Sequence, residues 1–419
     1  DGLTGLSATR LAEWIALRAV SAEEVMAAFL DRIAAQGAAL NAIVALRPRD
    51  ALLAEARAAD AAPRRGWLHG LPLAVKDLVN VRGLRSTMGS PILADHVPAG
   101  DDLLAARLRG AGAILIGKTN TPEFGLGSHS YNPVYGVTAN PYDPTRSAGG
   151  SSGGAAAALA ARLVPVADGS DMMGSLRNPA AFCNVYGFRP SHGLVPPDAE
   201  GDVFLHQLAT DGPMGRTVED VARLLEVLAA PDPRNPHSRP WEPFSEGLDG
   251  DVAGMRIGWL GDWGGAYATE AGIIDLCAGA LGVLEDLGCE VTPVAPPFPA
   301  AAIWEAWTVL RSWAVAARLE PLHRDPARRA LLKPEALWEI ERGLALDAQQ
   351  VHRASVIRSD WYRCLAGLFL EHDALVLPSA QVWPFPRDWH WPREIAGRGM
   401  DSYHRWMEVV YPVSLAGVP

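Results

Sequence analysis

Two glycine-rich segments each present a serine in a position suited to nucleophilic chemistry. Ser151 lies in a Gly-Gly-Ser-Ser-Gly-Gly run that begins at Gly149, and Ser175 follows Gly174, 24 residues after Ser151. Several backbone N–H groups of such turns can point at one developing negative charge, because side chains cover them poorly. A serine at such a turn is a candidate nucleophile if a base takes its proton.

Lys76 is the candidate base. The chain has eleven histidines, and none has the sequence context of a catalytic triad. Lys76 instead follows a short apolar run, Leu71 to Val75, which is typical of a buried strand. Burial lowers the pKa of a lysine and makes it a usable base near neutral pH.

Each of these signals is weak by itself. A lone Gly-Gly-Ser is usually a turn, and a lysine after a strand is usually a solvated end residue. An alternative of a different class is a non-catalytic protein that uses the glycine loops to bind a phosphate or nucleotide. The absence of a Gly-Lys-Ser/Thr ending speaks against that alternative.

The combination of motifs resembles a known family. The stretch from Gly149 to Pro190 resembles the amidase signature, which is defined by the Gly-Gly-Ser-Ser-Gly-Gly segment and a second serine 24 residues later. The resemblance covers about residues 10–230 well and the remainder loosely. Further blocks match in the family's order: Gly70 to Pro72, Val75 to Asp77, Gly117 to Phe124, Asn140-Pro141, Ser175 to Arg177, Pro179-Ala180, Gly187 to Pro190, Gly212 to Met214 and Arg216 to Val218.

The resemblance implies a role for each site residue. Ser175 is expected to be the acylated nucleophile, Lys76 the neutral general base, and Ser151 the proton shuttle between them. The peptide bond between Gly150 and Ser151 is expected to be cis. Support is expected from Ser152 and Asp171, with Arg177 as the partner of Asp171. The oxyanion hole is expected from the N–H groups of Met172, Met173, Gly174 and Ser175. No cofactor and no metal ion are expected.

One residue departs from the family pattern. The family usually has a second glycine where this chain has Met173. A glycine there can use backbone angles that a methionine dislikes. The predicted hole therefore depends on ordinary angles at Met173, and its flexible side chain would suit an apolar pocket wall.

The substrate expectations rest on aromatic residues and on the nucleophile loop. Substrate binding is expected from Gly125, Leu126, Gly127 and Trp383. An aromatic pocket favours aryl or alkyl amides, and the nucleophile loop is similar to those of bacterial urethanases and aryl acylamidases. We therefore expect amides, carbamates or esters with apolar groups. The runner-up is a glutamine amidotransferase A-type subunit, against which the aromatic C-terminal half speaks.

The helices and strands expected around these residues are typical of an α/β fold. The resemblance implies a large twisted mixed β-sheet sandwiched between layers of α-helices, in one domain spanning 1–419. Its catalytic core is expected at about 65–230 and a Trp-rich helical substrate-covering region at about 300–400. The C-terminus is expected to be truncated. The residues between 155 and 178 are expected to form a helix over Ala155–Leu163, a strand over Val164–Ala167, a turn over Asp168–Ser175 and an N-cap at Asn178.

The composition argues against several classes of binding partner. The net charge is −11 with no long basic run, which argues against nucleic acid and against an anionic membrane surface. The four cysteines form no C-x-x-C pair and fit a reducing cytoplasm, where we expect the protein. No apolar run reaches 18 residues. The expected partner is a small amide or carbamate substrate, bound by a monomer or a homodimer.

Overall fold

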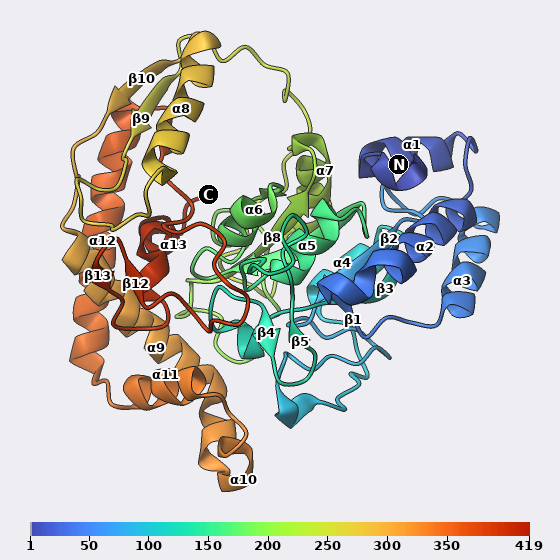
Figure 1. The fold of residues 1–419 in the computed structure, drawn as a ribbon, viewed down its shortest axis with the longest axis horizontal. Coiled ribbons are helices and arrows are strands. Elements are labelled where there is room, and N and C mark those ends of the chain that lie inside the picture. Colours follow the sequence, from blue (N-terminus) through green and yellow to red (C-terminus); the bar gives the residue numbers. More distant parts are fainter. Residues whose placement is uncertain (1) are drawn as a thin grey trace. The chain divides into compact units, whose positions relative to one another are not determined.

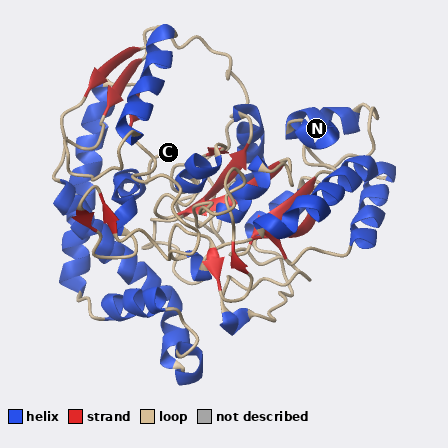
Figure 2. Ribbon diagram, viewed as in Figure 1, coloured by secondary structure: helices blue, strands red, loops and turns tan. Residues whose placement is uncertain are grey.

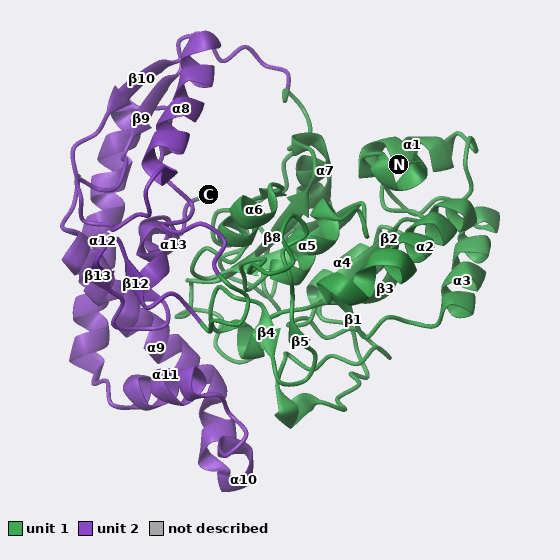
Figure 3. Cartoon of the chain, in the orientation of Figure 1, with its two compact units in different colours: residues 1–248, 386–390, 419 green, residues 249–385, 391–418 purple. Residues whose placement is uncertain are grey.

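The computed structural model describes residues 2–419, which fall into two compact units (Figure 3). Unit 1 holds the residues up to Leu248, together with 386–390 and Pro419, and unit 2 holds 249–385 and 391–418. Every expected catalytic residue lies in unit 1. The prediction of one domain across the whole chain stays a prediction.

Unit 1 alternates helices with short strands, as expected for an α/β fold (Figures 1 and 2). Its helices are α1 (Ala8–Ala16), α2 (Ala22–Leu40), α3 (Arg49–Ala61), α4 (Leu103–Gly110), α5 (Gly153–Ala160), α6 (Arg177–Cys183) and α7 (Val218–Leu228). Its strands are β1 (Ile43–Val44), β2 (Pro72–Lys76), β3 (Ile114–Thr119), β4 (Tyr131–Asn132), β5 (Gly136–Val137), β6 (Val166–Asp171), β7 (Tyr186–Gly187) and β8 (Thr210–Gly215).

Hydrogen bonds group these strands into small sheets. The order β1-β3-β2 forms one mixed sheet, in which β2 runs parallel to β3 and β1 antiparallel. The order β6-β8-β7 forms a second, antiparallel sheet. Strands β2 and β6 lie next to each other. The large mixed sheet expected from the sequence is thus present in unit 1 as two adjoining three-stranded sheets.

Buried side chains alternate between the two faces of these sheets, and helices pack on both faces. In β2, Ala74 joins a core cluster that contains residues of α2 and α5, whereas Leu73 and Val75 join a cluster that contains residues of α4 and α7. In β3, Ile116 and Leu115 divide in the same way. Successive side chains of a strand point to opposite faces, so the arrangement requires helices on both sides.

The local predictions around the serines need three corrections. Strand β6 continues to Asp171, so the turn that was expected from Asp168 onward begins only after Asp171. Asn178 is not an N-cap, because α6 already begins at Arg177 and the residue before it, Leu176, has helical backbone angles. Helix α5 also begins earlier than expected, at Gly153.

Unit 2 is mainly helical. Its parallel sheet has the order β10-β9-β11. As expected for most of the tryptophans, Trp307 and Trp361 are buried core residues. The elements are β9 (Arg256–Trp259), α8 (Ile273–Asp286), β10 (Glu290–Pro293), α9 (Ala300–Arg324), α10 (Pro326–Arg329), α11 (Pro334–Leu344), α12 (Ala348–Glu371), β11 (Ala374–Val376), β12 (Glu394–Ile395), β13 (Arg398–Gly399) and α13 (Tyr411–Ala416). Across residues 2–419, no helix combines the length and the hydropathy needed to cross a bilayer.

Candidate active site

Lys76 is the last residue of β2 and is buried. Its side chain is 1% exposed. The Nζ atom lies 2.8 Å from Ser151 Oγ, 2.8 Å from Ser152 Oγ and 2.9 Å from Ser170 Oγ. Lys76 forms no ion pair with any described residue of the chain. The lysine is therefore held by serine hydroxyls rather than by a carboxylate.

Burial shifts the protonation equilibrium of this lysine. Desolvation lowers the pKa of Lys76 to about 8, while the negative charges of Asp211, Asp168 and Asp171 oppose that shift. A substantial neutral fraction near physiological pH follows. A neutral amine has a lone pair that can accept a proton from the Ser151 hydroxyl.

The loop that carries Ser151 is shaped by close backbone contacts. The Gly150–Ser151 peptide bond is cis, as the family resemblance implies. Gly154, the second residue of α5, lies so near to Asn120 that a Cβ there would be 2.3 Å from the Asn120 backbone nitrogen. Only glycine fits at such a distance. The Ser128 hydroxyl donates to the carbonyl of Gly150 at 2.8 Å and holds the other side of the loop.

The turn that carries Ser175 is organised by Asp171. This buried carboxylate accepts the Gly174 N–H at 2.8 Å, the Leu176 N–H at 3.1 Å and two N–H groups of Arg177, both at 3.0 Å. Burial alone would raise the pKa of Asp171, but Arg177 and Arg189 hold it well below its usual range. The predicted pairing of Asp171 with Arg177 is thus present in the structure.

The N–H groups expected to form an oxyanion hole differ in their hydrogen bonding, and their role stays a prediction. Gly174 N–H is taken by Asp171, whereas the N–H groups of Met173 and Ser175 donate to no acceptor among the described residues. The left-handed backbone angle of the turn falls on Gly174, with φ of 83°, and not on Met173. The side chain of Met173 is buried. Methionine therefore fits at this position without backbone strain.

Ser175 itself is 7% exposed. Its backbone carbonyl accepts the Ser152 N–H at 3.3 Å, which ties the nucleophile turn to the serine loop. Among the described residues, the Ser175 hydroxyl makes no hydrogen bond to Ser151. The structure thus contains the Lys76–Ser151 half of the expected proton path, while the Ser151–Ser175 half is not a hydrogen bond here.

The expected substrate-binding residues lie in different units. Gly125 lies near Ser151, since a Cβ built on it would be 3.8 Å from Ser151 Oγ. Leu126 and Gly127 follow it directly in the chain. Trp383 belongs to unit 2, where its Nε1 donates to the Ala271 carbonyl at 3.1 Å. A role for Trp383 in substrate binding stays a prediction.

Sequence reasoning missed three polar residues around Lys76. Ser170 contacts its ammonium group, and both carboxylate oxygens of Asp168 accept the Lys76 backbone N–H at 3.2 Å. Asp211 lies opposite Ser170 in β8. The extended length of β6 was the available signal, because a strand through Asp171 puts Asp168 and Ser170 on one face.

A second buried lysine supports the backbone behind the site. Lys118 Nζ donates to the carbonyl oxygens of Lys76 and Val79, and it lies 3.9 Å from the Asp77 carboxylate. Burial lowers the pKa of Lys118 to about 8. Carbonyl groups and a carboxylate surround this lysine, so it fixes the chain at the end of β2 and has no hydroxyl to activate.

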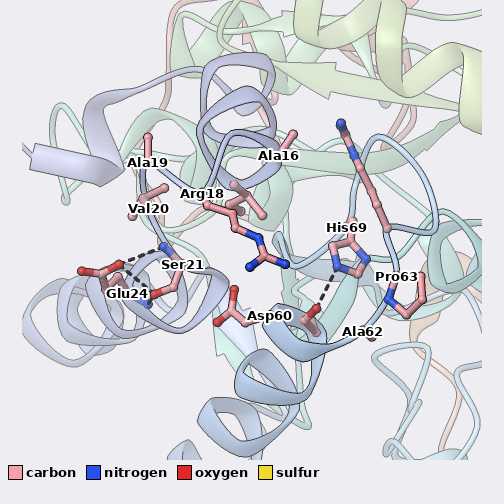
Figure 4. A pocket seen from close by; sticks show the side chains of 13 residues that line it. Ala16, Arg18, Ala19, Val20, Ser21, Glu24, Asp60, Ala62, Pro63 and His69 are labelled. Atoms are coloured by element: carbon pink, nitrogen blue, oxygen red, sulfur yellow. Dashed lines mark hydrogen bonds between the residues drawn. The ribbon is translucent and has the colours of Figure 1, made fainter.

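A separate pocket of about 490 Å³ lies among α1, α2 and α3 (Figure 4). The acidic side chains of this pocket already form hydrogen bonds at the start of a helix. Asp60 accepts the N–H groups of Ala22 and Glu23 at the start of α2, and Glu24 closes a capping box with Ser21. This pocket contains none of the expected catalytic residues.

Comparisons with known proteins identify the family of this chain. The family model described as Amidase matches residues 24–419. An acylamidase of Rhodococcus erythropolis is 34% identical over all of this chain and 88% of its own length. The A-type subunit of the glutamyl-tRNA(Gln) amidotransferase of Thermus thermophilus is 35% identical over 96% of this chain and 86% of its own length.

Solved structures give the same result. The crystal structure of a bacterial aryl acylamidase of the amidase signature family superposes with a TM-score of 0.91 at 30% identity, over 98% of this chain and 88% of that one. The α/β amidase-signature fold predicted from the sequence is therefore confirmed. The chain belongs to the amidase signature family of hydrolases, which act on amides.

Proposed function

We propose that the protein hydrolyses amides through an acyl-enzyme on Ser175, with Ser151 as the proton shuttle and Lys76 as the general base. The observation that carries the proposal is the 2.8 Å contact between Lys76 Nζ and Ser151 Oγ in a buried setting that lowers the pKa of the lysine to about 8. A base poised near the working pH is what proton transfer requires.

The proposed reaction has two halves. Neutral Lys76 takes the Ser151 proton while Ser151 takes the Ser175 proton, and Ser175 Oγ attacks the amide carbon. The N–H groups of Met173 and Ser175 stabilise the oxyanion, and loss of one such donor typically costs about 3 kcal/mol. Ser151 then passes a proton to the leaving nitrogen, and water hydrolyses the acyl-enzyme by the reverse proton path.

The proposed substrates carry apolar or aryl groups. Support comes from the similarity to an acylamidase and to an aryl acylamidase, and from the buried apolar Met173 in the nucleophile turn. Carbamates and esters are included because they present the same kind of carbonyl to Ser175 and need no further catalytic group.

A substrate panel tests the proposal. Nitroanilide amides, aryl esters and aryl carbamates are incubated with the wild-type protein and with Ser175→Ala. We expect turnover of the amides that Ser175→Ala lacks. Turnover that survives in Ser175→Ala would remove Ser175 as the nucleophile, and turnover of esters without amides would remove the amidase assignment.

A glutaminase is the second candidate function. The A-type subunit of a glutamyl-tRNA(Gln) amidotransferase is about as similar to this chain as the acylamidase is, at 35% and 34% identity. Sequence identity therefore supports the glutaminase as much as it supports the acylamidase. Glutamine therefore belongs in the same panel, with ammonia release as the readout. Ammonia released from glutamine faster than any nitroanilide is cleaved would favour the glutaminase.

A further inference from the structure

One face of strand β6 is directed at Lys76. Asp168 and Ser170 lie on that face because side chains alternate along a strand. Ser170 Oγ lies 2.9 Å from Lys76 Nζ, and Asp168 accepts the Lys76 backbone N–H. The face therefore surrounds the lysine at both its main chain and its ammonium group.

Strand β8 adds a further carboxylate to this face. It pairs antiparallel with β6, and Asp211 stands directly opposite Ser170. Directly opposed residues of an antiparallel pair have Cβ atoms about 5 Å apart on the same side of the sheet. Asp211 thus shares the face of Ser170 and Lys76, although 41 residues separate it from Ser170 in sequence.

We propose that Asp211 is a positioning residue that acts through Lys76 and sets the pH range in which this lysine serves as the base. The inference rests on the proposed function, since it assigns Asp211 a part in the protonation of the proposed base. Asp211 touches none of the reacting atoms in this account.

The other charged groups near Lys76 each have a hydrogen-bond or ion-pair partner, although Asp168 also adds its charge to the causes that raise the pKa of Lys76. Asp171 is paired with Arg177 and Arg189. Asp168 is bound to the backbone N–H of Lys76. On the β3 side, Lys118 lies 3.9 Å from Asp77.

Asp211 differs from these groups. Its carboxylate has no hydrogen-bond donor and no ion pair among the described residues. Burial, followed by the charges of Asp168, Asp198 and Asp102, raises its pKa to about 7, while Lys76 opposes that rise. Asp211 also heads the charges that raise the pKa of Lys76. The charge of each group therefore affects the pKa of the other.

The sign of the effect follows from electrostatics. An ionised Asp211 favours the charged form of Lys76. Replacing it by asparagine keeps the shape and removes the charge, so the pKa of Lys76 falls and the neutral base persists to lower pH. The size expected for one nearby charge is about one pH unit.

The test measures how fast an inhibitor inactivates the free enzyme, so it needs no substrate. The rate of inactivation by phenylmethylsulfonyl fluoride is measured from about pH 5.5 to about pH 10 for the wild type, Asp211→Asn, Asp211→Glu and Asp95→Asn. We expect the midpoint of the Asp211→Asn profile to lie about one pH unit below that of the wild type. Asp211→Glu should keep the wild-type midpoint, and so should Asp95→Asn, which removes a charge from an exposed residue.

The outcomes separate this inference from the proposed function. An Asp211→Asn profile that is lowered at every pH with an unchanged midpoint would overturn the role of Asp211 and leave the nucleophile in place. Peptide mapping of the labelled wild type, with Ser175→Ala beside it, tests the proposed function itself. If Ser175→Ala is labelled as fast as the wild type, the proposed function fails, whatever Asp211→Asn does.

Discussion

Each of the two units contains a buried cluster of ionisable residues, and the two clusters handle charge in opposite ways. In unit 2, Arg311 and Glu339 lie 2.7 Å apart, and Glu339 also accepts the hydroxyls of Ser312 at 2.6 Å and Tyr403 at 2.8 Å. In unit 1, Lys76 is equally buried but is bound to serine hydroxyls and has no ion-pair partner among the described residues.

The pKa shifts follow from this difference. The charge of Arg311 holds the pKa of Glu339 below its ordinary value despite complete burial. Burial of Lys76 instead lowers its pKa to about 8, because nearby carboxylates only partly compensate the lost solvation. The ion-paired cluster stabilises two opposite charges, whereas the cluster without an ion pair keeps a basic amine available for chemistry. The comparison makes four predictions.

The largest expected effect is on turnover. Lys76→Met should reduce hydrolysis at about pH 7 by about 1,000-fold, in line with loss of a general base. Wild-type activity should rise with pH through about 8, as Lys76 loses its proton, and the variant should lack this limb. Initial rates on the best substrate of the panel, measured across pH, check both. A variant that keeps the wild-type limb would show that another group titrates.

The next effect is on stability in unit 2. Glu339→Gln leaves Arg311 buried without its counter-ion, and breaking a buried pair in this way costs about 3–5 kcal/mol. Urea unfolding monitored by tryptophan fluorescence measures the loss of unfolding free energy. The matched control is Glu320→Gln, which removes the partner of Arg324 in an ion pair where Arg324 is largely exposed. A loss no larger than that of the control would contradict the contrast between the clusters.

Removing the buried charge of unit 1 should instead raise the stability of the protein. A buried lysine whose pKa falls from 10.5 to about 8 destabilises the fold by about 3 kcal/mol at pH 7. Lys76→Met removes this penalty, and the Ser152 hydroxyl retains its hydrogen bonds to the backbone N–H and carbonyl of Ser170. We expect Lys76→Met to unfold at higher urea than the wild type.

The pH dependence of this gain has a defined direction. The unfolded lysine binds a proton more tightly than the folded one, so wild-type stability rises between about pH 8 and about pH 10.5. The advantage of Lys76→Met should therefore be full below about pH 8 and fade toward about pH 10.5. An advantage that is constant with pH would point to packing rather than to the charge of Lys76.

The smallest expected effect comes from a serine of the unit 2 cluster, which should affect stability but not turnover. Ser312→Ala removes one hydrogen bond to Glu339 and should lower the unfolding free energy by about 1–3 kcal/mol. Turnover per folded molecule should stay at the wild-type level, because Ser312 belongs to unit 2 and to no proposed catalytic role. A loss of turnover comparable to that of Ser175→Ala would overturn this division.

The sequence predicted the residues that sit in short motifs. Ser151, Ser175 and Lys76 were found because glycine runs and an apolar strand surround them, and the family resemblance supplied the cis bond at Ser151. The pairing of Asp171 with Arg177 was also predicted, and it too came from the family resemblance.

The partners of Lys76 outside those motifs were not predictable in the same way. Asp211 and Ser170 meet only through the register of two antiparallel strands, which a single sequence does not reveal. The N-cap assigned to Asn178 was wrong because the turn held by Asp171 starts the helix earlier. That turn also takes the Gly174 N–H from the expected oxyanion hole, a hydrogen bond that depends on where the buried carboxylate points.

The most direct test of the account locates the activated serine and its dependence on Lys76. Wild-type protein and Lys76→Met are treated with phenylmethylsulfonyl fluoride at about pH 8, and the modified peptides are identified by mass spectrometry over time. The account predicts an adduct on Ser175 in the wild type, formed at least about 100-fold more slowly in Lys76→Met. An adduct on another residue, or equal rates in the two proteins, would contradict it.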